Sequence, residues 1–143
     1  MPEIRSIEPQ PAITERAVTD HAGIPSVVDR IFPALLGKLQ AAGAEPAGAP
    51  FIRYHETGEE FSLELGIPAP EGVATATLPG GRVAVYRHVG PFSGLPEAFS
   101  AAHAWAEEQG EEPAGGSWES YVTDPREEPD SSKWITDIVV PLA

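Results

Sequence analysis

Glu119 is an acid within residues 118–123, a stretch whose aromatic and β-branched residues predict a β-strand. Side chains alternate faces along a strand, so Glu119, Tyr121 and Thr123 should share one face. A carboxylate that leaves water costs several kcal/mol unless it is paired or hydrogen-bonded, or unless its pKa rises. Because such acids gather at functional sites, a ligand pocket is favoured here over a solvated glutamate beside a core tryptophan.

Two tyrosines could supply aromatic surface to the same ligand. Tyr54 follows Phe51 by three residues, and Tyr121 follows Trp118 by three. Rings of this kind stack on flat molecules or hold a cation over the ring face, which contributes about 1–2 kcal/mol when the pair is desolvated. The alternative, two core tyrosines with satisfied hydroxyls, stays open.

Other chemistries have little support in the sequence. The histidines lack the spacing of a metal site and there is no cysteine, so no metal and no cofactor are expected; they are His21, His55, His88 and His103. Ser100, Ser117 and Ser120 lack a nucleophile-elbow motif, which disfavours a serine hydrolase.

The chain contains one half twice. Gly43–Tyr54 reappears as Gly110–Tyr121 at a constant offset of 67 residues. Upstream, Gly23-Ile24-Pro25 matches Gly94-Leu95-Pro96 at an offset of 71, and downstream Phe61–Pro68 matches Trp134–Pro141 at 73. The offset falls from 71 to 67 between the first two matches, a loss of about one helical turn. It then rises from 67 to 73, a gain the size of a loop.

The repeat gives each candidate residue a partner. Tyr54 corresponds to Tyr121, Phe61 to Trp134, and Ile52 to Glu119. An acid where the sister half keeps isoleucine is expected to be at least partly buried. Duplicated units commonly pack about a pseudo-twofold axis, and the cleft between them is a natural ligand site.

Hydrophobic periodicity and turn residues predict the elements that position these side chains. A first strand is expected over residues 2–18 with a break at Pro9 and Pro11, and a helix from Val27, capped by Ser26 and interrupted by Pro33, should stop at Gly43. The remaining expected elements are strands 51–56 and 61–67 joined through Thr57-Gly58-Glu59, strands 73–77 and 82–89 joined through residues 78–81, a helix over 95–109, and strands 118–123 and 133–140. The predicted class is α+β: a tandem strand–helix–strand–strand repeat with pseudo-twofold symmetry, antiparallel sheets, helices outside and a central cleft. We expect one domain over residues 1–143, built of repeats 1–70 and 71–143.

Composition restricts the partners. The net charge of −13 should repel phosphate backbones and anionic lipid, so neither nucleic acid nor membrane is an expected partner. A hydrophobic content of 41% fits a folded protein, and no leader or membrane-spanning run is present, which predicts a cytoplasmic location. The acidic surface favours cationic partners.

Three segments carry a family resemblance: Pro50–His55, Gly81–Phe92 and Ser117–Pro125. Their order and spacing resemble the GyrI-like small-molecule-binding domain, the effector-binding half of many AraC- and MerR-type transcription regulators. The resemblance implies a tandem-repeat fold and a pocket with Glu119 in its floor, where it meets aromatic cations. It also implies that Tyr54, Tyr121 and Trp134 line the pocket; Phe92, after a Gly-Pro turn, is a weaker candidate. Because no helix-turn-helix is recognised, a stand-alone form without a DNA-binding domain is expected.

Three functions remain open. The leading one is a module that sequesters or senses hydrophobic, aromatic and cationic small molecules. The second is a hydrolase of cyclopropane-bearing natural products, in which Glu119, next to the Tyr121 hydroxyl, would act as acid or base in adding water to the strained ring. The third is an interaction protein that resembles gyrase inhibitors, although no feature of the sequence identifies a protein partner.

Overall fold

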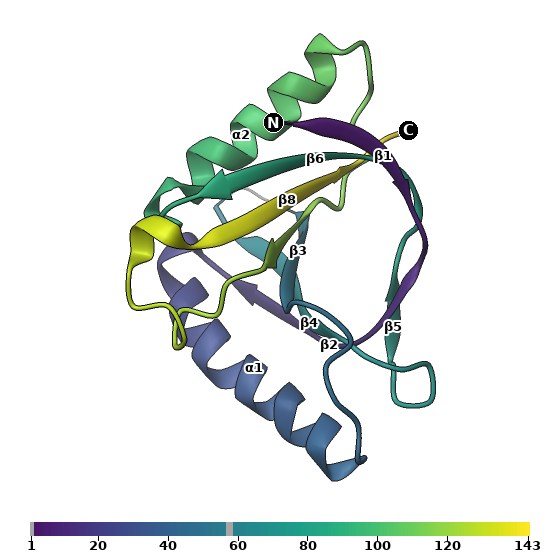
Figure 1. Ribbon diagram of the computed structural model, residues 1–143, viewed down its shortest axis with the longest axis vertical. Helices are drawn as coiled ribbons and strands as arrows, with labels where there is room; N and C mark the ends of the chain where they lie inside the picture. The colour runs from purple at the N-terminus through teal and green to yellow at the C-terminus, as the bar shows by residue number, and fades with distance from the viewer. Residues whose placement is uncertain (1, 57–58) are drawn as a thin grey trace. The chain divides into compact units, whose positions relative to one another are not determined.

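The computed structural model of the protein describes residues 2–56 and 59–143 (Figure 1). The chain forms two compact units, and one of them is made of two separate stretches of the sequence. The N-terminal unit is Glu8–Gly80, and the C-terminal unit combines Met1–Ile7 with Gly81–Ala143. Each unit is an antiparallel sheet with one long helix.

The N-terminal unit holds the first copy of the repeat. Its elements are β2 (Gln10–Thr19), the short helix η1 (His21–Gly23), α1 (Ile24–Ala41), β3 (Phe51–Glu56), β4 (Phe61–Pro68) and β5 (Ala76–Leu78). The strand order is β3-β4-β2-β5. In α1 the residues that face the core are large: Val27, Ile31, Leu35 and Leu39.

The C-terminal unit repeats this topology. Its elements are β1 (Glu3–Ile7), β6 (Gly81–Val89), η2 (Phe92–Gly94), α2 (Leu95–Glu108), β7 (Trp118–Tyr121), η3 (Ser131–Lys133) and β8 (Ile135–Pro141). The order β7-β8-β6-β1 matches β3-β4-β2-β5, with β1 taking the place of β5. The predicted α+β class and strand–helix–strand–strand repeat are confirmed.

The strand registers agree with the sequence repeat residue by residue. Ile52 lies opposite Leu65 in the β3–β4 ladder. Glu119 lies opposite Ile138 in the β7–β8 ladder, at the equivalent position. The acid therefore does replace an apolar residue in the same structural place.

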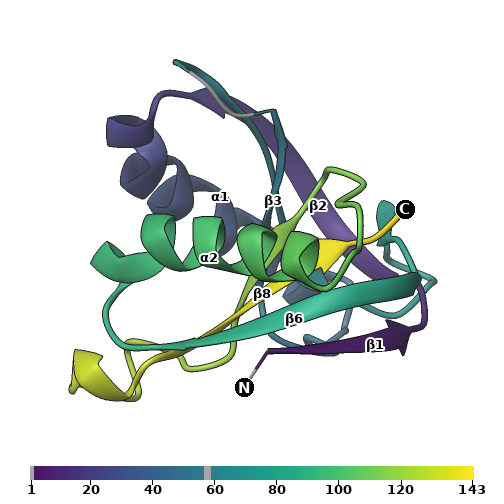
Figure 2. The same cartoon turned by 90° about the horizontal axis from the view of Figure 1, so that it is seen from above.

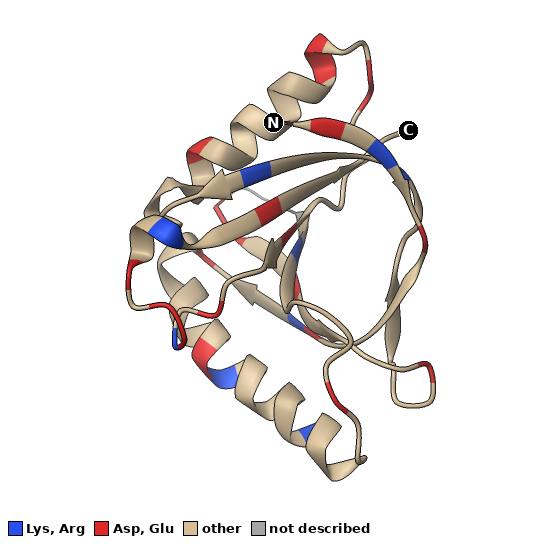
Figure 3. Cartoon of the chain, viewed as in Figure 1, with Lys and Arg blue, Asp and Glu red and all other residues tan. Residues whose placement is uncertain are grey.

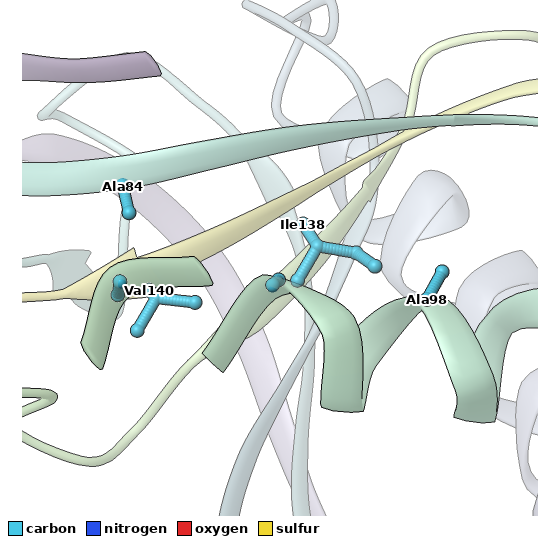
Figure 4. Close-up of a cluster of buried hydrophobic side chains, with 6 residues drawn as sticks. Ala84, Ala98, Ile138 and Val140 are labelled. Carbon is cyan, nitrogen blue, oxygen red and sulfur yellow. The ribbon is translucent and has the colours of Figure 1, made fainter. Parts of the chain in front are cut away.

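The helix of the C-terminal unit packs through small residues. Ala98, Ala102 and Ala106 contact Ile138 and Val140, and Ala84 completes the cluster (Figure 4). Figure 2 shows α2 lying along β6 and β8. Because directly opposed residues of an antiparallel pair share a face, Ile138 places Glu119 on the face of the sheet that carries α2.

Several boundaries differ from those predicted. The expected strand over 2–18 is two strands, and β1 pairs with β6 of the C-terminal unit while β2 pairs with β4 and β5. The predicted cap Ser26 is wrong, because α1 begins at Ile24 and Pro25 occupies its first turn, where a missing N–H costs little. Pro33 does not divide the helix.

The predicted ends of the two helices are confirmed. Gly43 and Gly110 adopt φ of 70° and 78° just after the two helices, as residues that end helices do. The turn Thr57-Gly58-Glu59 lies partly outside the described residues. Strand β5 starts later than predicted, at Ala76, and pairs with β2.

Acidic residues outnumber basic ones by 22 to 9 and occur on strands, helices and loops of both units (Figure 3). In the part of the chain that the structure describes, no helix is both long and apolar enough to cross a membrane.

Candidate ligand-binding site in the C-terminal unit

Glu119 is a buried carboxylate. Its residue is 3% exposed, and the Tyr121 hydroxyl donates a hydrogen bond to Glu119 Oε1 at 2.9 Å. The prediction that Glu119 and Tyr121 share a face is therefore confirmed. A hydrogen bond to a carboxylate is stronger than one between neutral groups, and this one offsets part of the cost of burial.

Three aromatic rings lie together, and one of them is the Tyr121 ring whose hydroxyl bonds to this carboxylate. The Phe92 ring packs edge-on to Tyr121, with ring centroids 5.6 Å apart, and lies 4.8 Å from the Trp134 ring. The Trp134 indole N–H donates to the Glu128 carbonyl at 2.7 Å, which fixes the orientation of the indole. Phe92 is 37% exposed, so the stack of Phe92, Tyr121 and Trp134 presents apolar surface to solvent.

Phe92 is positioned by the turn before α2. Its short helix η2 follows Gly90, which has a φ of 139°, and Pro91. The His88 ring bonds to the Pro91 carbonyl through Nε2 at 3.1 Å, so His88 supports the turn. Four of the five predicted ligand-binding residues, Phe92, Glu119, Tyr121 and Trp134, thus lie in one unit.

The fifth, Tyr54, belongs to an equivalent aromatic group in the N-terminal unit. Its ring packs edge-on to Phe61 at 6.2 Å, and Phe61 packs edge-on to His21 at 6.1 Å. His21 stands at the repeat position of Phe92, at the offset of 71 that also relates Gly23 to Gly94. The expected convergence of Tyr54 and Tyr121 on one ligand stays a prediction.

At several positions where the N-terminal unit has an apolar residue, the C-terminal unit has a polar one. Thr136 lies opposite Tyr121 where Leu63 lies opposite Tyr54. It is fully buried, and its hydroxyl has no hydrogen-bond partner among the described residues. Ser117 stands at the repeat position of Pro50, is 3% exposed, and bonds to His103 Nε2 at 3.0 Å.

Sequence reasoning missed a second buried acid, Glu64, in β4. It alternates with Leu63 and Leu65 and so lies on the other face of its sheet. Burial alone would raise the pKa of Glu64, but hydrogen bonds from His55, at 2.8 Å, and Thr14, with the charge of Arg16, hold that pKa below its ordinary value.

The repeat did carry a signal for this acid. Arg16 lies opposite Glu64 in the β2–β4 ladder, as Arg87 lies opposite Asp137 in the β6–β8 ladder. The second pair is bidentate, at 2.8 and 3.0 Å. An arginine and an acid kept at equivalent positions indicate a cross-strand pair.

The local chemistry suits recognition of a ligand by charge and by rings. Within residues 2–56 and 59–143, no group of three or more acidic or histidine side chains has metal-binding geometry. One open depression, lined by Pro11, Glu71 and residues 74–77 beside β5, contains none of the candidate residues.

The chain is similar in fold to several solved structures. The crystal structure of the EcmrR C-terminal domain matches with a TM-score of 0.85 and 22% identity, over 100% of this chain and 97% of that one. The structure of SAV2435 bound to tetraphenylphosphonium matches with a TM-score of 0.65 and 13% identity, over 100% and 94%. A hydrolase from Listeria innocua matches with a TM-score of 0.65 and 17% identity, over 99% and 91%.

No curated protein is significantly similar to the chain in sequence. The model of the GyrI-like small molecule binding domain, in contrast, matches residues 1–143. The repeat, the two-unit topology and this match agree, and the protein belongs to the GyrI-like family of small-molecule-binding domains.

Proposed function

We propose that the protein binds hydrophobic aromatic cations at the Phe92–Tyr121–Trp134 stack, with Glu119 as the countercharge. The observation that carries this proposal is the hydrogen bond from Tyr121 to the buried Glu119, because Tyr121 also contacts the partly exposed Phe92 ring. A continuous path of contacts thus leads from solvent to the carboxylate.

The energetics favour a cation that carries rings. A desolvated cation over an aromatic face gains about 2 kcal/mol, and a carboxylate in a medium of low dielectric attracts a cation more strongly than in water. A neutral ligand of the same shape gains the ring contacts but not the charge. The charge of −13 also raises the local concentration of cations around the protein.

The comparisons support the ligand class. The neighbour SAV2435 is described as bound to tetraphenylphosphonium, a cation with four phenyl rings. At 13% identity this likeness concerns the fold, so the residues named above make the case for this chain.

Calorimetric titration tests the proposal with a matched ligand pair, tetraphenylphosphonium and the neutral triphenylphosphine oxide. Glu119→Gln should weaken binding of the cation at least about tenfold and change the affinity for the oxide by less than about twofold. The control is Glu64→Gln, the same change at a buried acid on the other face of the N-terminal sheet, which should leave both affinities within about twofold. An equal loss of both ligands in Glu119→Gln would contradict the proposal.

A second candidate is hydrolysis of strained cyclopropane electrophiles. As water adds to one ring carbon and the C–C bond breaks, Tyr121 can protonate the leaving carbon while Glu119 takes the proton of the water, and this proton then returns to Tyr121. Turnover by the wild type that is lost in Tyr121→Phe, with cation binding kept, would favour this candidate. The interaction protein resembling gyrase inhibitors stays a prediction.

A further inference from the structure

Ser117, the residue before β7, is hydrogen-bonded to His103 of α2 close to the proposed site. His103 lies on α2, and its ring bonds to the Phe99 carbonyl through Nδ1 at 2.8 Å and to Ser117 Oγ through Nε2 at 3.0 Å. Ser117 is separated from Glu119 by one residue, and its bond to α2 places it on the helix-bearing face with that acid. Residues two apart on a strand lie roughly 7 Å from each other.

The bond to Phe99 identifies one protonated nitrogen of the ring. A carbonyl oxygen only accepts, so Nδ1 of His103 must carry the proton that bonds to Phe99. In the neutral tautomer with this proton, Nε2 has a lone pair, and the Ser117 hydroxyl donates to it. The Ser117 oxygen keeps its own lone pairs, and no described residue other than His103 is hydrogen-bonded to that hydroxyl.

The repeat indicates that this arrangement is not needed to build the unit. The corresponding position in the N-terminal unit is Pro50 for Ser117, and Phe32 or Leu36 for His103, depending on where the helical turn is removed. Glu119 likewise replaces Ile52 and Thr136 replaces Leu63. On the helix-bearing face of the C-terminal unit, Ser117, Glu119 and Thr136 therefore stand where the N-terminal unit has apolar residues.

We propose that Ser117, oriented by His103, is a second polar subsite that accepts a hydrogen bond from a ligand hydroxyl or amine roughly 7 Å from the cationic centre. The subsite rests on the proposed function, since Glu119 holds the cation. Because the Ser117 proton is committed to His103, the subsite takes donors and rejects groups that only accept. The protein thereby distinguishes a cationic phenol from its methyl ether.

Three cations of one shape test this subsite by calorimetry: trimethyl(2-phenylethyl)ammonium, its 4-hydroxy derivative and its 4-methoxy derivative. The wild type should bind the 4-hydroxy compound about tenfold more tightly than the other two. Ser117→Ala should reduce that preference to about twofold or less and leave the parent cation within about twofold. Thr136→Val, which removes the other buried hydroxyl of this face, should keep the preference.

His103→Leu provides a readout that a purely structural role would not change. Without the Nε2 acceptor, the Ser117 hydroxyl can donate to the ligand, so the 4-methoxy cation should bind about fivefold more tightly than the parent cation. If Ser117→Ala does not fold, the double variant Ser117→Ala/His103→Leu removes both partners and serves in its place.

The outcomes separate the two proposals. Binding of the parent cation without discrimination between hydroxy and methoxy, or a preference that survives Ser117→Ala, overturns the subsite alone. Failure of all three cations to bind overturns the proposed function and the subsite with it.

Discussion

Glu119 occupies in the β7–β8 ladder the position that Ile52 occupies in the β3–β4 ladder, opposite Ile138 and Leu65 respectively. The same backbone thus accepts a carboxylate in one unit and a branched alkyl group in the other. This relationship supports the proposal that Glu119 binds a ligand, since residues at functional sites commonly reduce stability.

The first prediction follows from that exchange. Because the equivalent backbone position holds Ile52 in the N-terminal unit, the double variant Glu119→Ile/Tyr121→Phe should keep its free energy of unfolding within about 1 kcal/mol of the wild type or exceed it. Binding of tetraphenylphosphonium should be lost. Urea unfolding and calorimetry measure the two effects, and a loss of several kcal/mol in stability would show that the acid holds the fold together.

Phe92 should contribute to binding much more than to stability. It is partly exposed, and its ring contacts both Tyr121 and Trp134. We expect Phe92→Ala to weaken aromatic cations about tenfold and to lower the free energy of unfolding by less than about 1.5 kcal/mol. Val122→Ala is the control, because Val122 is 46% exposed and follows Tyr121 beyond the end of β7; an equal loss of affinity in the control would count against the stack.

Thr136 carries a hydroxyl that the fold does not use. Thr136 is fully buried, and its Oγ1 has no hydrogen-bond partner among the described residues. Thr136→Val keeps the shape and removes that unpaired group, so the temperature of unfolding should rise by an amount equivalent to about 1 kcal/mol. A lower unfolding temperature in calorimetric scans would mean that the hydroxyl is paired in solution.

Glu64 should make the free energy of unfolding depend on pH. The pKa of Glu64 in the folded protein is below its ordinary value near 4.5, so the carboxylate stabilises the fold above that pH. This contribution is lost as the pH falls through the lower, folded-state pKa. Glu64→Gln should cost about 2 kcal/mol at neutral pH, and the difference from the wild type in urea unfolding should vanish in acid. A difference that persists below the folded-state pKa would show that packing, not charge, is responsible.

The repeat made much of the fold predictable. Equivalent offsets located both helices, and Gly43 and Gly110 marked their ends, because an αL glycine is a local signal. The exchange of β1 into the C-terminal unit could not be predicted, since the proline break after Ile7 shows that the chain bends but not which strand it then joins.

The site was predictable in part for a similar reason. The exchange of Ile52 for Glu119 is visible in the sequence, whereas the bond between His103 and Ser117 joins a helix to the residue before a strand and depends on tertiary packing. The sequence repeat already aligned Phe92 with His21. That both residues belong to an aromatic group could be recognised only from the ring contacts that each makes in its own unit.

A structure of the protein with tetraphenylphosphonium tests the central claim most directly. The phosphonium should lie beside the Glu119 carboxylate, with its centre within about 6 Å of the Tyr121 or Trp134 ring. A ligand bound instead in the depression lined by Pro11, Glu71 and residues 74–77, with Glu119 untouched, would contradict the claim.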